Sequence, residues 1–199
     1  MEFKISKFIH IKEHSIYLNK ARIFSEERSL TLSGFLKSAY KVQGIIWPKF
    51  HKMDGLSKLG ILATEILFQS QNLPEDTALV FSNSSSSLGT DEVHQKSIDQ
   101  VVSPSVFVYT LPNIVMGEIC IKNKLYGENS FFITEEFNPT LIWEYSQSLL
   151  DSLAASAIVC GWIEWKNAEY DVFLCLVRRE GSQIFSAENL EALYNFENE

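Results

Sequence analysis

Cysteines, histidines, serines and acidic residues are the side chains of this chain that could do chemistry. The three cysteines, Cys120, Cys160 and Cys175, lie far apart in apolar segments and form no Cys-x-x-Cys pair. This pattern is typical of reduced thiols in a protein core rather than of a redox motif or a disulfide framework. The histidines show no convincing spacing of metal ligands, so we expect no metal site and no cofactor. They are His10, His14, His51 and His94.

A run of serines and a pair of glutamates are the other candidates. Residues 84–87 are all serine, but they lack the glycines and the Lys-Ser or Lys-Thr pair of a phosphate-binding loop, so we expect a structural turn. The sequence assigns them no histidine and aspartate partners for nucleophilic catalysis. Glu135 and Glu136 precede Asn138, where the dipole of a following helix favours carboxylates. Asp171 is on a different predicted element, so an acid–base pair with these glutamates is not indicated.

The elements that carry these residues are predicted from hydrophobic periodicity and turn signals. Asp54 and Asn138 are expected N-caps, Pro112 is expected in the first turn of a helix, and Gly127 is expected to end that helix. The predicted strands are 3–11 with a bulge, 15–18, 77–81, 130–134, 157–165 and 170–178. The predicted helices are 32–41, 55–70, 112–127, 138–153 and 186–196. Strands that alternate with helices, followed by a hairpin joined at 166–169, predict one α/β domain over residues 1–199.

The helix at 138–153 is expected to be amphipathic. Its apolar side should face the sheet, and its polar side should face solvent or a polar interface. The apolar positions are Ile142, Tyr145, Leu149 and Leu153, and the polar ones are Glu144, Gln147, Ser148 and Asp151.

Composition limits the classes of partner. The net charge of −8, without a Lys/Arg cluster, argues against nucleic acid. No apolar run reaches the roughly 20 residues of a membrane span, and the N-terminus does not resemble a signal peptide, so we expect a cytoplasmic protein. An acidic partner would need a local basic patch. The alternative is that the exposed lysines simply form a solvated surface without a binding role. Candidates for this patch are Lys37, Lys41, Lys49, Lys52, Lys58, Lys122 and Lys124.

Three stretches together resemble a known family. Residues 52–67 begin with Met53-Asp54 and continue as an amphipathic helix, and residues 78–90 read as a strand with a Gly/Ser-rich turn. The third stretch, 106–134, combines an aromatic residue, a Pro-Asn pair, a helix, a Gly-x-Asn turn and a strand. Its members are Phe107, Pro112-Asn113, Gly117, Gly127-Glu128-Asn129 and Ser130 to Thr134. In this order the stretches resemble the N-terminal half of the β-ketoacyl-acyl-carrier-protein synthases of the thiolase-like superfamily, over roughly residues 44–179.

The resemblance implies a half thiolase-like fold: a five-stranded mixed sheet with one antiparallel strand and helices on both faces. In the family the strand leads to a Thr-x-Cys nucleophile, but here Glu136 occupies the cysteine position after Thr134 and Glu135. The C-terminal half and its histidines are also missing. Chain-length factors, which carry glutamine at this position, show a similar departure. We therefore expect no catalytic residue of the family type in this chain.

Two functions remain open at this stage. The first is a non-catalytic, chain-length-factor-like partner in fatty-acid or polyketide biosynthesis. The second is an acyltransferase with residual 3-oxoacyl-acyl-carrier-protein synthase-type activity through an unrecognised residue. The resemblance also implies a homodimer, or a heterodimer with an active ketosynthase, and acyl carrier protein as a further partner. The dimer would form through the strand Ser130, Phe131, Phe132, Ile133 and Thr134, supported by Pro112 and Asn113, with the two phenylalanines on opposite faces.

Overall fold

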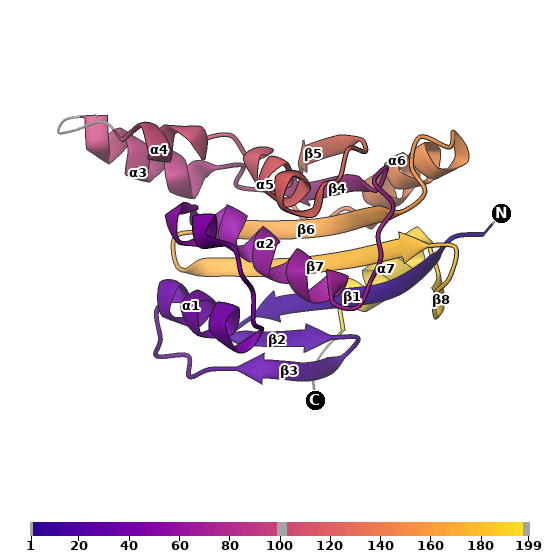
Figure 1. Cartoon of the computed structure of the whole chain (residues 1–199), viewed down its shortest axis with the longest axis horizontal. Coiled ribbons are helices and arrows are strands. Elements are labelled where there is room, and N and C mark those ends of the chain that lie inside the picture. Colours follow the sequence, from indigo (N-terminus) through magenta and orange to yellow (C-terminus); the bar gives the residue numbers. More distant parts are fainter. Residues whose placement is uncertain (1, 99–102, 197–199) are drawn as a thin grey trace.

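The computed structural model describes residues 2–98 and 103–196 and is built around one mixed β-sheet. The strand order is β3-β2-β1-β7-β6-β4-β5, and β8 pairs with the start of β1, so that β3 and β5 form the two ends of the sheet (Figure 1). The strands are β1 (Lys4–Lys12), β2 (Ser15–Leu18), β3 (Ala21–Ser25), β4 (Ala78–Asn83), β5 (Asn129–Ile133), β6 (Ile158–Lys166), β7 (Glu169–Arg178) and β8 (Gln183–Ile184).

The sheet is mixed, as expected, and it contains more strands than expected. β4 is parallel to β5 and β6, whereas β7 is antiparallel to both β6 and β1. Within the five strands β1, β7, β6, β4 and β5, only β7 therefore runs against the others, as expected for half of a thiolase-like fold. The expectation of five strands in all is wrong, because β2, β3 and β8 add to the sheet on the β1 side. β2 and β3 are a meander that continues β1 through two tight turns whose residues have positive φ, Glu13-His14 and Asn19-Lys20.

Helices cover both faces of the sheet. They are α1 (Leu32–Val42), the 3₁₀-helix η1 (Pro48–Lys52), α2 (Gly55–Phe68), α3 (Leu88–Ile98), α4 (Pro104–Val108), α5 (Ile114–Asn123), α6 (Pro139–Asp151) and α7 (Ala187–Tyr194). α1, α2 and α5 share one hydrophobic core with one face, and in Figure 1 α2 lies across this near face. α6 and α7 share a second core with the other face. In the described residues, no helix has the length and apolar character needed to cross a membrane.

Local caps position the helices that matter for the site. Asp54 Oδ1 accepts a hydrogen bond from Ser57 N at 2.9 Å, and Asn138 Oδ1 accepts one from Leu141 N at 2.9 Å, so both predicted N-caps are confirmed. Because such a cap satisfies N–H groups that have no partner inside the helix, it fixes where each helix begins.

The predicted ends of α5 are wrong. The helix begins at Ile114, after Pro112 and Asn113, and it ends at Asn123. Lys124 adopts the left-handed conformation that closes the helix, with φ of 56°. Gly127 has another role, because a Cβ there would lie 2.4 Å from the carbonyl oxygen of Thr77. The glycine is therefore needed where the chain passes close to the backbone that leads into β4.

The sheet-facing side of α6 also differs from the prediction. Ile142, Ser146 and Leu150 are buried, and Tyr145 and Leu149 are only partly buried. Leu153 is 78% exposed, because the helix ends at Asp151 and the helical period no longer applies beyond it. The predicted polar side is correct in outline, since Glu144, Ser148 and Asp151 are exposed and Gln147 is half-buried.

The β6–β7 hairpin is confirmed with a shorter turn than predicted. Lys166 pairs directly with Glu169, which leaves only Asn167 and Ala168 in the turn. Asn167 has φ of 58°, which asparagine tolerates better than most residues.

Candidate functional site

Glu136, which the family resemblance assigns to the nucleophile position, lies in the loop between β5 and α6. Its side chain is exposed, and its carbonyl oxygen accepts a hydrogen bond from Thr134 Oγ1 at 2.8 Å. The loop borders an open cavity of about 580 Å³, lined by residues 134–140 and by Glu191. Asn138 uses its side chain to cap α6, so the loop presents carboxylates and a capped helix rather than a nucleophile.

Phe137 is the residue of this loop that points into the protein. It is buried against Trp162, Phe173 and Tyr194, and its ring centroid lies 4.6 Å from that of Tyr194. The Tyr194 hydroxyl donates a hydrogen bond to Asp171 Oδ2 at 2.7 Å. Burial, followed by this contact with Asp171, raises the pKa of Tyr194.

Asp171 is tied to Tyr194 and is not paired with Glu136. Burial raises the pKa of the Asp171 carboxyl, and the hydrogen bond from Tyr194 partly opposes this rise. No sequence pattern associates Tyr194 with the loop at Glu136, because the two are nearly 60 residues apart and on unrelated elements. What the fold brings together here is an aromatic cluster with one buried carboxyl.

The three thiols lie away from this loop. Cys160 and Cys175 are directly opposite each other on β6 and β7 and are fully buried, and burial raises the pKa of Cys160 to about 12. Cys120 is half-buried on α5, where its Sγ lies 3.5 Å from Asn129 Oδ1. All three are free thiols, and none is placed at the start of α6 in the way that a thiolate nucleophile requires.

The serine turn after β4 is held by a carboxylate from β6. Glu164 Oε2 accepts hydrogen bonds from Ser84 N and Ser84 Oγ, both at 2.7 Å, and from Ser85 N at 3.2 Å. The other carboxylate oxygen accepts from Trp165 N at 3.0 Å. Backbone N–H groups that could cradle an anion are therefore already occupied, which agrees with the expected structural turn.

The histidines are dispersed through the fold. His10 is buried on β1 and its Nε2 lies 3.0 Å from the carbonyl oxygen of Leu193, whereas the His14 ring packs against Phe35. Across residues 2–98 and 103–196, no three His, Cys, Asp or Glu side chains are grouped so that they could hold one metal ion.

The predicted dimer strand, β5, is an edge of the sheet. Among the described residues it pairs with β4 alone, and its two phenylalanines lie on opposite faces, Phe131 against the α2–α5 core and Phe132 against the α6–α7 core. Leu79 N donates to Glu128 O, and Thr134 N donates to Asn83 O. Since residues in a parallel ladder alternate between their two neighbours, residues 129, 131 and 133 direct their N–H and C=O groups to the free edge.

Apolar side chains accompany this free edge. Ile133 on β5 is 52% exposed, and Ile121 and Tyr126, which precede the strand, are also exposed. Pro112 is half-buried and Asn113 is exposed at the start of α5. An edge strand with exposed apolar neighbours is a surface that favours pairing with another chain.

Basic residues are concentrated in one part of the sequence. Residues 28–64 contain six lysines and arginines and one acidic residue, although the whole chain carries −8. Lys49 is engaged with Glu118 at 2.6 Å and Lys122 with Glu65 at 2.6 Å. Of the other candidates, Lys37, Lys41, Lys52 and Lys124 are exposed and Lys58 is half-buried.

No protein-family model and no curated protein matches this sequence. Solved structures do match. The chain superposes with a TM-score of 0.64 and 14% identity on the ishigamide ketosynthase/chain length factor, over 89% of this chain and 62% of that one. It superposes with a TM-score of 0.57 and 12% identity on a ketosynthase in complex with its chain length factor from Xenorhabdus doucetiae, over 98% and 90% of the two chains.

A third match is a type II PKS acyl-carrier protein in complex with its ketosynthase, with a TM-score of 0.64 and 10% identity, over 90% of this chain and 62% of that one. The chain thus spans about three fifths of the length of the first and third of these structures. The sequence motifs predicted this structural likeness, and the superpositions extend over most of this chain. This protein has the fold of the ketosynthases and chain length factors, in a form that resembles half of a ketosynthase.

Proposed function

We propose that this protein is a non-catalytic, ketosynthase-like partner, similar in role to a chain-length factor of polyketide or fatty-acid biosynthesis. The observation that carries the proposal is the ketosynthase fold together with an exposed Glu136 where the family resemblance implies the nucleophile. A carboxylate is a poor substitute for a thiolate in forming a thioester, and no described thiol lies beside it.

The proposed mode of action is association through β5. The outward N–H and C=O groups of residues 129, 131 and 133 would pair with a strand of the partner and form one continuous sheet across the interface. Ile133 and neighbouring apolar side chains would be covered at the same time. Pro112 and Asn113 would support this interface from the start of α5.

The partner is either a second copy of this chain or an active ketosynthase. The solved structures that support the second choice are assemblies of a ketosynthase with a chain length factor and of a ketosynthase with an acyl-carrier protein. Acyl carrier protein, which is acidic, is a further proposed partner, and the exposed lysines between residues 28 and 64 would provide its complementary charge.

Analytical ultracentrifugation tests the assembly. The wild-type chain should sediment as a dimer at micromolar concentration, and Ile133→Glu should convert it to a monomer by placing a charge at the free edge. Ile23→Glu is the matched control, because Ile23 lies on β3 at the opposite edge and is 37% exposed. A wild-type monomer that copurifies with a ketosynthase from its host would favour the heterodimer. A monomer without such a partner contradicts the proposal.

Intact-mass spectrometry tests the absence of catalysis. Incubation with acyl-CoA or acyl carrier protein should leave the mass unchanged, because the nucleophile position holds Glu136. A stoichiometric acyl adduct would instead support the acyltransferase alternative, and its position would identify the residue responsible. An adduct at Cys120 or Cys160 would also overturn the interpretation of these thiols as unreactive.

A further inference from the structure

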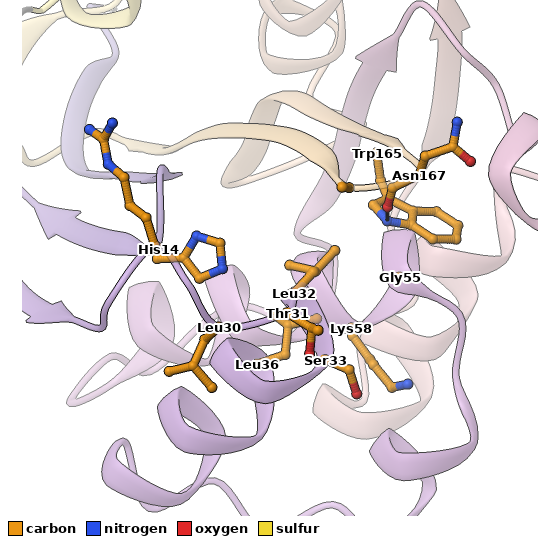
Figure 2. A pocket seen from close by; sticks show the side chains of 12 residues that line it. His14, Leu30, Thr31, Leu32, Ser33, Leu36, Gly55, Lys58, Trp165 and Asn167 are labelled. Carbon is orange, nitrogen blue, oxygen red and sulfur yellow. Dashed lines mark hydrogen bonds between the residues drawn. The ribbon is translucent and has the colours of Figure 1, made fainter.

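A cavity of about 630 Å³ lies at the carboxyl ends of β1 and β6, between the first turns of α1 and α2. Four separate segments enclose it: the β1–β2 turn, residues 28–36, the start of α2 and the β6–β7 turn (Figure 2). It shares no residue with the cavity beside Glu136. Its volume falls in the range of about 300–1,000 Å³ that is typical of small-molecule sites.

Much of the cavity wall is apolar. Leu30, Leu32 and Leu36 come from α1 and the residues before it, and Trp165 closes the opposite side at the end of β6 (Figure 2). The Trp165 indole packs closely on two glycines, since a Cβ on Gly55 would lie 2.2 Å from it and a Cβ on Gly89 would lie 2.8 Å from it, and its Nε1 donates to Asn167 O at 3.1 Å. These contacts place the indole as an apolar surface that a bound molecule would meet.

The polar groups of the cavity are cationic or neutral. Arg28, Lys58 and His14 line it, and no aspartate or glutamate is among its lining residues, although the chain contains 25 acidic residues. Two acidic residues act on these cations: Glu13 pairs with Arg28 at 2.5 Å, and Asp54, which accepts from Ser57 N and from the Thr90 hydroxyl, interacts electrostatically with Lys58. Because Glu13 offsets the charge of Arg28, the positive charge of the cavity is concentrated at Lys58.

Lys58 gives this charge a specific position. It is half-buried and, within the described residues, it forms no ion pair within 4.0 Å. Burial lowers the pKa of its ammonium group, and Asp54 opposes this effect. The start of α1 adds partial positive charge, because Leu32 and Ser33 are in its first turn and line the cavity. An anionic group placed here would give Lys58 a direct ion pair, since Asp54 acts on its ammonium group only from more than 4.0 Å away.

We propose that this cavity binds an amphipathic anion, a small molecule with an apolar body and a single carboxylate or phosphate group. The body lies between the leucines of α1 and the indole of Trp165, and the anionic group meets Lys58 and the first turn of α1. This site is separate from Glu136 and from the β5 edge, so it does not depend on the proposed association.

Isothermal titration calorimetry tests the proposal with naphthalene-2-carboxylate and 2-naphthyl phosphate as probes. Naphthalene-2-methanol is the neutral control of the same shape. We expect one or both anions to bind, the neutral alcohol to bind about tenfold more weakly, and Lys58→Met to lose about tenfold in affinity for the anion. The two anionic probes show whether the site prefers a carboxylate or a phosphate.

Two matched variants separate the site from general effects on the fold. Ser33→Trp places a bulky ring at the exposed mouth of the cavity and should abolish binding. Lys41→Met removes an exposed lysine of the same helix that does not line the cavity, and it should leave the affinity unchanged. The proposal is overturned if neither anion binds at millimolar concentration, if the alcohol binds as well as the anions, or if Lys58→Met and Lys41→Met behave alike.

Discussion

Two glycines in neighbouring helices allow the packing of the near face to be tested with one kind of substitution. Gly60 lies in the middle of α2, where a Cβ would be 2.3 Å from Val115 Cγ2 and 3.4 Å from Ile163 Cδ1. Val115 and Ile163 are both fully buried, and the β-branched Val115 has little freedom to move aside. Gly117 lies in the middle of α5, where a Cβ would meet no atom within 4 Å.

Replacing either glycine by alanine gains about 1 kcal/mol of helix propensity. At Gly117 this gain is not opposed, so Gly117→Ala should raise the free energy of unfolding by about 0.5–1 kcal/mol. At Gly60 the new methyl group overpacks the core at a cost of about 1–3 kcal/mol. Gly60→Ala should therefore lower the free energy of unfolding by up to about 2 kcal/mol, and the two variants should differ by roughly 2 kcal/mol.

Urea unfolding followed by far-UV circular dichroism measures the free energy of unfolding of both variants. The comparison is valid if the slope of this free energy against urea concentration is unchanged. Val115→Ala in the Gly60→Ala background provides room for the added methyl group. The double variant should therefore lose less unfolding free energy than the sum of the losses of the two single variants. If Gly60→Ala is stabilised as much as Gly117→Ala, then α2 and α5 do not pack as closely as the structure has them.

Two further predictions concern the other face of the sheet. Leu150→Ala should lower the free energy of unfolding by about 2–5 kcal/mol, because Leu150 lies on the buried side of α6. Leu153→Ala should change this free energy by no more than about 0.5 kcal/mol; similar losses in urea unfolding would contradict the observed face of this helix. Burial lowers the pKa of His10 from 6.5 to about 4, so the unfolded chain takes up its proton first. Stability should therefore fall as the pH drops from 6.5 towards 4, less steeply in His10→Gln, and equal pH profiles by thermal unfolding would refute this account.

Local signals in the sequence predicted the parts of the fold that depend on neighbouring residues. Asp54 and Asn138 cap α2 and α6 through hydrogen bonds to residues three positions later, so their roles follow from short sequence patterns. The strand leading to Glu136 was also placed within one residue, because a turn and a short apolar run define it locally.

Other elements carry weak signals. β8 has two residues and β3 is largely exposed, so neither shows a strand pattern. α3 also lacks a continuous apolar stripe, since Val93 and Ile98 are exposed. These segments acquire their structure from strand pairing and chain connection rather than from their own periodicity.

The candidate sites differ in how local their signals are. The residues that define the Glu136 loop and β5 are contiguous, so the sequence alone could propose roles for them, and these roles remain predictions. The cationic cavity could not be found, because His14, Leu36, Lys58 and Trp165 come from separate segments and meet only after folding. Nothing in the spacing of these residues relates one to another, and only the sheet order, with β7 between β1 and β6, brings their elements together.

The helices on the α6–α7 face cover one another. α7 packs beside α6 and buries Leu190 and Leu193 in the same core. Trp143 Nε1 donates to the carbonyl oxygen of Phe185, just before α7, at 3.2 Å. The Tyr194 ring packs at a tilt against that of Phe137, next to Glu136. Because α7 covers part of α6, we expect the proposed association at the unpaired edge of β5 rather than at this face.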